Sequence, residues 1–383
     1  MTDFGIVGTY PPTQCGLATF SAALLAHLRS PLDRVEVVSP VDAYQPDAPP
    51  EVVYQWTKGS SVQTYEAARV LDDMDVVVLQ HEFGIFGGRD GRDVLELVHA
   101  CTVPMIVVLH TVLVEPTPSQ RNIIEQLVER ADAVVTMTRT AQERLVDNYV
   151  VDPSRVHVIP HGAPDNRPRG DLRNVGAGAL PAALGRGRSV LTWGLIGPGK
   201  GIEWGIEAIA QLRDLEPDVH YYVVGETHPK VVERMGERYR EGLVARAEAF
   251  GVADRVHFVD RYTPTSELHE LVRRADVVLL PYDSRDQVTS GVLVEAVTSV
   301  KPVVSTDFPH ARELLTSGAG LLVPPHDPGA IAAALRRVFT DQDLFDDLTA
   351  EAARIAPTQL WPAVADRFRK TAGTVLGRRA LAS

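Results

Sequence analysis

The sequence has few cysteines, no long apolar run and no excess of positive charge. Its only cysteines are Cys15 and Cys101, without CxxC spacing, which excludes a disulfide framework and favours a reducing compartment, the cytoplasm. No stretch approaches the ~18 apolar residues of a membrane span, and the N-terminus lacks signal-peptide character, so we expect neither secretion nor insertion. The formal net charge of −12 argues against nucleic-acid binding, which needs a basic surface. The acidity and the lack of a basic amphipathic helix also do not favour peripheral membrane contact.

Short apolar runs alternate with helical patterns in the first half of the chain. The runs typical of strands buried on both faces are 5–8, 35–38, 76–79, 105–109, 133–137 and 156–159. Helical periodicity appears between them at 18–28, 60–71 and 120–130. This alternation predicts a parallel, doubly wound sheet, hence a Rossmann-like domain.

A second series of the same kind follows a stretch rich in Pro and Gly at 163–188. Its apolar runs are 189–194, 220–225, 256–259, 275–280, 302–305 and 320–323. Since 383 residues exceed what one core usually organises, we predict an α/β protein with two domains. The predicted division is an N-terminal domain 1–170, a linker 171–188, a C-terminal domain 189–360 and a terminal segment 361–383. Its helix would cross back to the first domain.

The most informative local pattern is a helix start near residue 290. Thr289 and Ser290 are good N-caps, Gly291 permits close approach to the backbone, and residues 292–297 form apolar first helical turns. The free amides of a helix N-terminus suit a diphosphate, and Glu295, one turn inside, could bind ribose hydroxyls. The alternative interpretation is an ordinary capped core helix.

These features together resemble the GT-B glycosyltransferases, specifically family 4 of the retaining enzymes. The resemblance rests on the two Rossmann-like domains, the Lys200-Gly201 turn after a strand, the Val-Ile-Pro-His-Gly segment at 158–162 and the late helix that carries Glu295. It covers essentially the whole chain. It implies a cleft between the domains, a nucleotide-sugar donor, no cofactor and no essential metal.

Two residues depart from the family pattern. The family has a pair of glutamates eight positions apart; the second, which holds the ribose, corresponds to Glu295, but the first is Gln287 here. A neutral amide can bind a sugar hydroxyl but cannot act as an acid or a base. Relatives usually carry a phosphate-binding arginine where Leu195 stands. Lys200 matches the family's lysine and is expected to contact phosphate, with a solvated loop lysine as the alternative.

The first domain offers further candidates after its strands. His110 follows the run 105–109 at the carboxyl edge, where open sheets bind ligands, and the family has a histidine there near the donor sugar; a structural histidine is the alternative. We expect His81 and Glu82, which follow the run 76–79, to bind the acceptor. We expect the same of Tyr10, which follows the first strand. A metal at His81 and Glu82 lacks a nearby third ligand.

The resemblance thus implies three groups of site residues. The catalytic group is His110, Lys200 and Gln287, and the acceptor group is Tyr10, His81 and Glu82. The donor group comprises Gly16, in the loop after the first strand, two strand-end positions and the helix start: Gly225, Glu226, Arg261, Thr289, Ser290, Gly291, Val292, Leu293 and Glu295. Asp73 and Asp75 have DxD spacing but precede their strand, at the opposite edge, so we interpret them as a solvated turn.

The resulting prediction is retaining transfer of a hexosyl group from a GDP-mannose or UDP-glucose type donor to a saccharide or small glycoside. Mannosyl is slightly preferred over glucosyl on general similarity. Two other hypotheses remain open: a sugar-nucleotide epimerase, which should need additional carboxylates, and a non-catalytic protein that binds sugar nucleotides.

Overall fold

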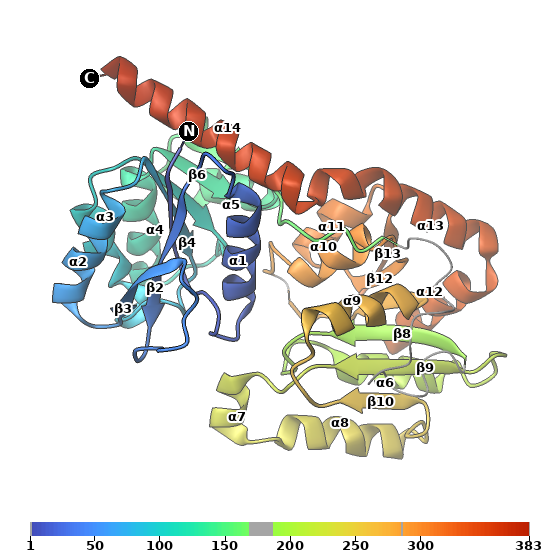
Figure 1. The fold of residues 1–383 in the computed structure, drawn as a ribbon. Helices are drawn as coiled ribbons and strands as arrows, with labels where there is room; N and C mark the ends of the chain where they lie inside the picture. The colour runs from blue at the N-terminus through green and yellow to red at the C-terminus, as the bar shows by residue number, and fades with distance from the viewer. Residues whose placement is uncertain (1, 168–186, 285, 383) are drawn as a thin grey trace. The chain divides into compact units, whose positions relative to one another are not determined.

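The structure, a computed structural model, describes residues 2–167, 187–284 and 286–382 (Figure 1). It divides into two compact units: unit 1 is Met1–Gly162 with Trp361–Ser383, and unit 2 is Ala163–Leu360. Each unit is built on a parallel sheet with helices, so the predicted fold class of two Rossmann-like domains is confirmed. Of the expected linker 171–188, all but the last two residues lie outside the described part.

Unit 1 contains seven parallel strands in the order β3-β2-β1-β4-β5-β6-β7. Their bounds are β1 Phe4–Val7, β2 Val35–Val41, β3 Val52–Thr57, β4 Val76–His81, β5 Met105–Leu109, β6 Ala133–Thr136 and β7 Val156–Val158. The sequence pattern missed β3. This strand lies at the edge of the sheet and is only partly buried, so it lacks the continuous apolar run of a strand covered on both faces.

The helices of unit 1 begin at polar caps that the sequence supplies. They are α1 Gly16–Leu28, α2 Ser61–Leu71, α3 Val94–Ala100, α4 Pro118–Arg130, α5 Arg139–Asn148 and α14 Trp361–Ala382, with short 3₁₀ turns η1 Arg89–Gly91 and η2 Pro153–Arg155. Thr117 and Gln120 form a capping box at α4, and Ser60 and Thr138 cap α2 and α5. Each cap satisfies an amide that the helix itself leaves open.

The terminal helix α14 belongs to the core of unit 1. It lies against α1 (Figure 1) and buries Trp361, Phe368 and Val375 in that core. A Cβ at Gly162 would come within 2.2 Å of the Trp361 ring, so only glycine fits beneath the indole. The helix therefore returns to the first domain as predicted.

Unit 2 has six parallel strands in the order β10-β9-β8-β11-β12-β13. Its strands are β8 Arg188–Trp193, β9 Val219–Val224, β10 Val256–Val259, β11 Val277–Leu280, β12 Val303–Thr306 and β13 Gly320–Val323. Its helices are α6 Ile202–Ala210, α7 Pro229–Met235, α8 Arg238–Ala249, α9 Thr265–Arg274, α10 Gly291–Thr298, α11 Pro309–Leu315, α12 Pro328–Thr340 and α13 Gln342–Ile355, followed by the 3₁₀ turn η4 Ala356–Gln359.

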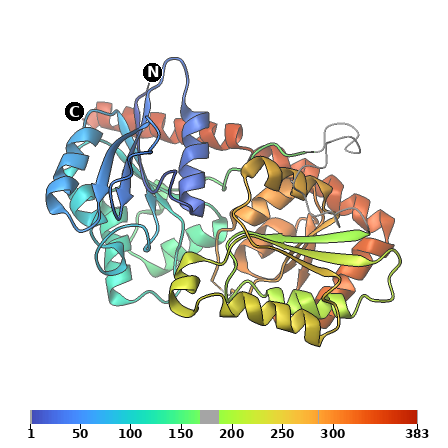
Figure 2. The same cartoon turned by 60° about the horizontal axis from the view of Figure 1, so that its bottom comes forward.

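Helices cover both faces of the sheet in unit 2 (Figure 2). Successive residues of β9 show why: Tyr221 enters the core on one face and Tyr222 the core on the other. The strand order reverses between β8 and β11 in unit 2, and between β1 and β4 in unit 1. Ligands of open α/β sheets bind at the carboxyl ends of the strands next to such a reversal, which directs attention to these two edges.

Candidate functional site

The start of α10 is the centre of the candidate site in unit 2. Ser290 is the N-cap, and its side chain accepts a hydrogen bond from the Leu293 amide at 3.2 Å. The Ser290 amide itself donates to Nδ1 of His310 at 2.8 Å. Of the four amides of residues 290–293, those of Ser290 and Leu293 therefore donate to partners, and those of Gly291 and Val292 have no partner among the described residues. Two free amides at a helix N-terminus still favour an anion.

Glu295 lies one turn inside α10 and is largely buried. Burial raises the pKa of its carboxyl to about 7, against the opposing effect of a hydrogen bond with the Trp193 side chain. Trp193 is the last residue of β8, so this bond joins the strand end to the helix. The carboxyl is thus held in place and poorly solvated, as a group that binds ligand hydroxyls should be.

The segment before α10 is held by its own side chains. The Gln287 side-chain amide donates to the Thr289 carbonyl at 3.0 Å. The Thr289 hydroxyl is buried and has no hydrogen-bond partner among the described residues. Gln287 therefore has a positioning contact that a glutamate at this place could not make, because a carboxylate has no proton to donate.

The turn that carries Lys200 packs against the end of β11. The Asp283 amide donates to the Gly199 carbonyl at 2.9 Å, and the Lys200 ammonium lies 4.3 Å from the centroid of the Tyr282 ring. Gly201 has φ +63°, and a Cβ there would lie 1.8 Å from the Pro281 carbonyl oxygen. The ammonium is consequently placed by a tight backbone contact and by a cation–π contact, rather than left on a free loop.

The ends of β9 and β10 hold the other donor candidates. Gly225 has φ +139°, and a Cβ there would lie 2.0 Å from the Gly194 carbonyl oxygen, so only glycine fits. The Glu226 carbonyl accepts a hydrogen bond from the Ile196 amide at 2.8 Å. Arg261 forms an ion pair with Glu267 of α9, and it would have to share that partner in order to contact a phosphate. These three residues stay predicted donor ligands.

His110 of unit 1 is held in one tautomer. Its Nε2 lies 2.7 Å from Oε1 of Gln80, an oxygen that can only accept, so Nε2 carries the proton and Nδ1 keeps its lone pair. Burial lowers the pKa of the imidazole to about 3, with further lowering by His161 and His81. His110 is therefore neutral near pH 7, when its Nδ1 can accept a hydrogen bond.

The acceptor candidates of unit 1 lie deeper than expected. The His81 side chain is fully buried between Phe83 and Phe86, and neither nitrogen has a partner among the described residues. Glu82 accepts from its neighbour's amide, Phe83, at 2.9 Å and from the Thr111 hydroxyl. A buried His81 offers no surface to an acceptor, so its burial does not favour the predicted role in acceptor binding.

The first loop of unit 1 contains one buried and one open candidate. Tyr10 is 3% exposed, and its hydroxyl donates to Glu51 at 3.0 Å. Burial and Glu51 raise its pKa well above the usual value. Gly16 begins α1, and a Cβ there would meet no atom within 4 Å. The space beside Gly16 is thus open to a ligand, whereas the Tyr10 hydroxyl is already hydrogen-bonded to Glu51.

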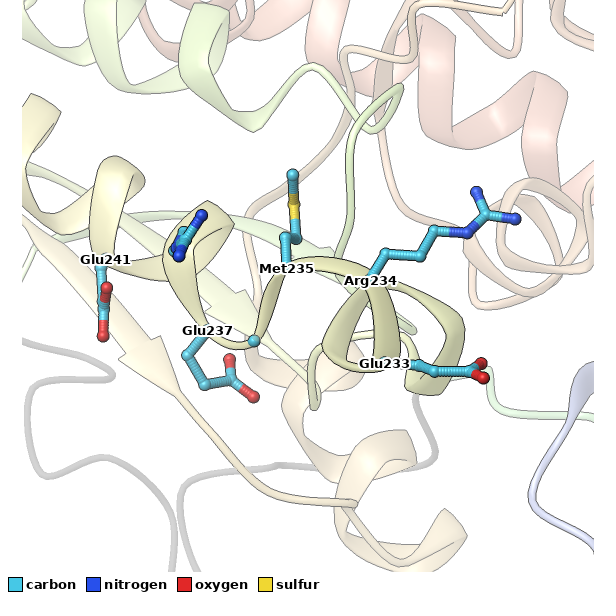
Figure 3. A pocket seen from close by; sticks show the side chains of 7 residues that line it. Glu233, Arg234, Met235, Glu237 and Glu241 are labelled. Carbon is cyan, nitrogen blue, oxygen red and sulfur yellow. The ribbon is translucent and has the colours of Figure 1, made fainter.

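A hollow of about 450 Å³ lies at the junction of α7 and α8, and none of the candidate residues lines it. Figure 3 shows that the side chains lining it, including Glu233, Met235 and Glu237, point in different directions instead of converging. We do not assign it a ligand.

The described residues contain no group of three or more side chains suited to hold a metal ion. Nor does any described helix have the length and apolar character that crossing a bilayer requires.

Two family models match the chain, one in each half. Residues 16–167 match Glycosyltransferase Family 4, and residues 187–341 match Glycosyl transferases group 1. Among curated proteins, the chain is 30% identical over 260 residues to D-inositol 3-phosphate glycosyltransferase of Corynebacterium glutamicum (strain R), covering 65% of this chain and 59% of that protein. It is 32% identical over 252 residues to the protein of the same name from Thermomonospora curvata, covering 64% and 57%. The chain thus spans less than two thirds of the length of these relatives.

Solved structures of other proteins share the fold. Anabaena HepE in complex with UDP and glucose aligns with a TM-score of 0.74 at 16% identity, covering 98% of this chain and 100% of that one. Sucrose-phosphate synthase from Thermosynechococcus elongatus aligns with a TM-score of 0.77 at 19% identity and full coverage of both chains. With both family models matched on its two halves, the chain belongs to the GT-B glycosyltransferases.

The sequence pattern did not reveal every residue that shapes these edges. His310, which accepts from the Ser290 amide, follows β12 and could have been found by its place at a carboxyl edge. Trp193 and Gln80 are strand residues without any motif. Their contacts with Glu295 and His110 depend on the sheet order, which no local pattern predicts.

Proposed function

We propose that this protein is a retaining glycosyltransferase that moves a hexosyl group from a nucleoside-diphosphate sugar to a carbohydrate acceptor. The observation that carries the proposal is the grouping in unit 2. The Glu295 carboxyl is bonded to Trp193 at the end of β8, and a Cβ at Gly194 would lie 3.8 Å from Val292. The Lys200 ammonium lies over Tyr282, just after the neighbouring strand β11. Those groups match a diphosphate and a ribose.

In this proposal the leaving diphosphate is stabilised by Lys200 and by the two free amides. Electrostatic stabilisation of the leaving group supplies most of the rate enhancement. Glu295 accepts hydrogen bonds from the ribose. Gln287 binds a sugar hydroxyl, since an amide cannot serve as nucleophile or base. Without a carboxylate at this position, attack from the face of the departing diphosphate suits the chain better than a covalent intermediate.

The donor and acceptor classes are drawn more broadly than one substrate. We retain the slight preference for a mannosyl over a glucosyl donor. Because HepE was solved with UDP and with UDP-glucose, UDP-sugars should be tested beside GDP-mannose. Two relatives are named for D-inositol 3-phosphate. A phosphorylated polyol is therefore the first acceptor to test beside free saccharides and small glycosides.

The experiment is an assay of nucleotide release from GDP-mannose, UDP-glucose and ADP-glucose, with EDTA present. Each donor is supplied alone, with D-inositol 3-phosphate and with simple glycosides. The proposal expects release that depends on one acceptor, with NMR showing a product of retained anomeric configuration. An epimerised donor in the absence of acceptor would support the epimerase hypothesis, and tight donor binding without release in any mixture would identify a non-catalytic binding protein.

A further inference from the structure

A buried arginine of α8 holds two of the loops at the nucleotide edge of unit 2. Arg240 is 6% exposed. Its Nη2 donates to the Gly225 carbonyl at 2.6 Å and lies 3.0 Å from the Asp260 carboxylate. Its Nε donates to the Thr227 hydroxyl at 3.2 Å. One planar guanidinium therefore ties the residues that follow β9 to the residue that follows β10.

The loops that Arg240 joins carry three predicted donor residues. Gly225 and Glu226 are in the first loop, and Arg261 directly follows Asp260 in the second. The first loop is also fixed from its other side, because the Ile196 amide donates to the Glu226 carbonyl. Arg240 thus completes a two-sided clamp on the backbone. Buried charge-assisted hydrogen bonds of this kind hold a binding loop in one shape before the ligand arrives.

We propose that Arg240 is a positioning residue for the donor, which keeps the 225–227 and 260–261 loops in the conformation that a nucleoside diphosphate sugar binds. The inference rests on the proposed function, since it assigns the donor to this edge. Arg240 touches the loops and not the reacting atoms. Its loss should therefore weaken donor binding while leaving the chemical step little changed.

The same two strands provide a matched control at their opposite ends. Arg255, just before β10, donates to Asp218, just before β9, at 2.8 Å. The two pairs are similarly exposed: the side chains of Arg240 and Asp260 are 8% and 53% accessible, and those of Arg255 and Asp218 are 15% and 47%. Arg255 lies at the amino edge, away from every donor candidate. Loss of either arginine should cost stability, but only Arg240 should affect the donor.

The test compares Arg240→Met, Arg255→Met and Asp260→Asn with the wild type in donor KM, kcat and melting temperature. We expect Arg240→Met to raise donor KM by about tenfold or more, because the loops lose the charged hydrogen-bond donor that holds them, with kcat within about threefold. Arg255→Met should lower the melting temperature without changing donor KM. Asp260→Asn, at an exposed side chain, should raise KM less and remain informative if Arg240→Met does not fold.

Two results would overturn the proposal. One is a donor KM within about twofold of the wild type in both Arg240→Met and Asp260→Asn. The other is an equal rise in Arg255→Met, which would show a general effect of instability. If the wild-type protein turns over no nucleotide sugar, the proposed function fails, and this inference fails with it. If the wild type turns over the donor and Arg240→Met leaves donor KM unchanged, only the proposed role of Arg240 fails.

Discussion

The carboxyl edges of the two sheets differ in the chemistry that they bury. Unit 1 buries imidazoles: burial lowers the pKa of His81 and of His110 to about 3 and that of His161 to about 4. Unit 2 buries an acid, Glu295, whose pKa burial raises to about 7. These imidazoles of the first edge are neutral near pH 7, whereas the second edge combines the Glu295 carboxyl with an ammonium and free amides. The second edge is therefore the one suited to an anion.

The two edges should also respond to pH in opposite directions. An unfolded histidine binds a proton near pH 6.5 and the folded ones do not, so stability from unit 1 is present above about pH 6.5 and lost as pH falls. The folded Glu295 keeps its proton up to about pH 7, whereas the unfolded one loses it near 4.5. The stability that the protonated Glu295 contributes is therefore fully present below about pH 4.5 and is lost as the pH rises to 7.

The largest expected effect comes from Gly225→Ala in unit 2. The new Cβ would meet the Gly194 carbonyl oxygen at 2.0 Å, at a φ of +139° that alanine rarely adopts. The ends of β8 and β9 must then separate, and we expect donor affinity to fall by roughly a hundredfold. Calorimetric titration with the donor measures this. Gly373→Ala in α14 of unit 1, where a Cβ would meet no atom within 4 Å, is the control and should bind donor as the wild type does.

Lys200→Ala should lower both donor affinity and rate by about ten- to a hundredfold, because the leaving diphosphate loses its ammonium partner. Steady-state kinetics with the donor varied gives both quantities. Lys370→Ala, an exposed lysine of α14, tests whether removing any positive charge is enough. Equal kinetics for Lys200→Ala and wild type would remove Lys200 from the site.

Glu295→Gln separates the function of the carboxyl from its cost to folding. At pH 8 the variant should bind donor about tenfold more weakly, because a ribose hydroxyl loses a charged acceptor. It should also be more stable than the wild type at pH 8, by roughly 1–3 kcal/mol, and equal to it near pH 4.5. Denaturant unfolding at the two pH values checks the second point. A stability difference that does not depend on pH would contradict the raised pKa.

His81→Phe examines unit 1 in the same way. His81 is fully buried among aromatic rings with no hydrogen-bond partner in the described chain, so an apolar ring of similar shape should raise stability by about 1 kcal/mol. The gain should increase as pH falls below 6.5. Thermal melts at pH 5 and pH 7.5 measure it. A lower melting temperature with a higher acceptor KM would instead restore His81 as an acceptor ligand.

The smallest effect is expected for Gln287→Glu, which restores the family's residue. The carboxylate cannot donate to the Thr289 carbonyl as the amide does, so stability should fall by about 1 kcal/mol. Donor KM should stay within about threefold, provided that the amide serves only as a hydroxyl ligand. A gain in kcat of an order of magnitude would show that the missing carboxylate limits the reaction.

Much of the fold could be predicted because buried parallel strands are continuous apolar runs. The predicted runs 256–259 and 320–323 have the same bounds as the strands β10 and β13. Edge strand β3 escaped because its exposed side chains break that pattern. At the site, the Ser290 cap and the position of Glu295 follow from local sequence. The partners of these residues do not, since His310 and Trp193 reach them from distant elements through the packing of the whole unit. The contact of Arg240 with Gly225 is equally invisible to a local pattern.

Calorimetric titration of the wild type with GDP-mannose, UDP-glucose and ADP-glucose, in EDTA, tests the central claim most directly. The account predicts selective binding of one nucleotide sugar without metal, and loss of that binding in Lys200→Ala but not in Lys370→Ala. Absence of binding to every donor, or binding that Lys200→Ala leaves intact, would contradict the assignment of the donor to the carboxyl edge of unit 2.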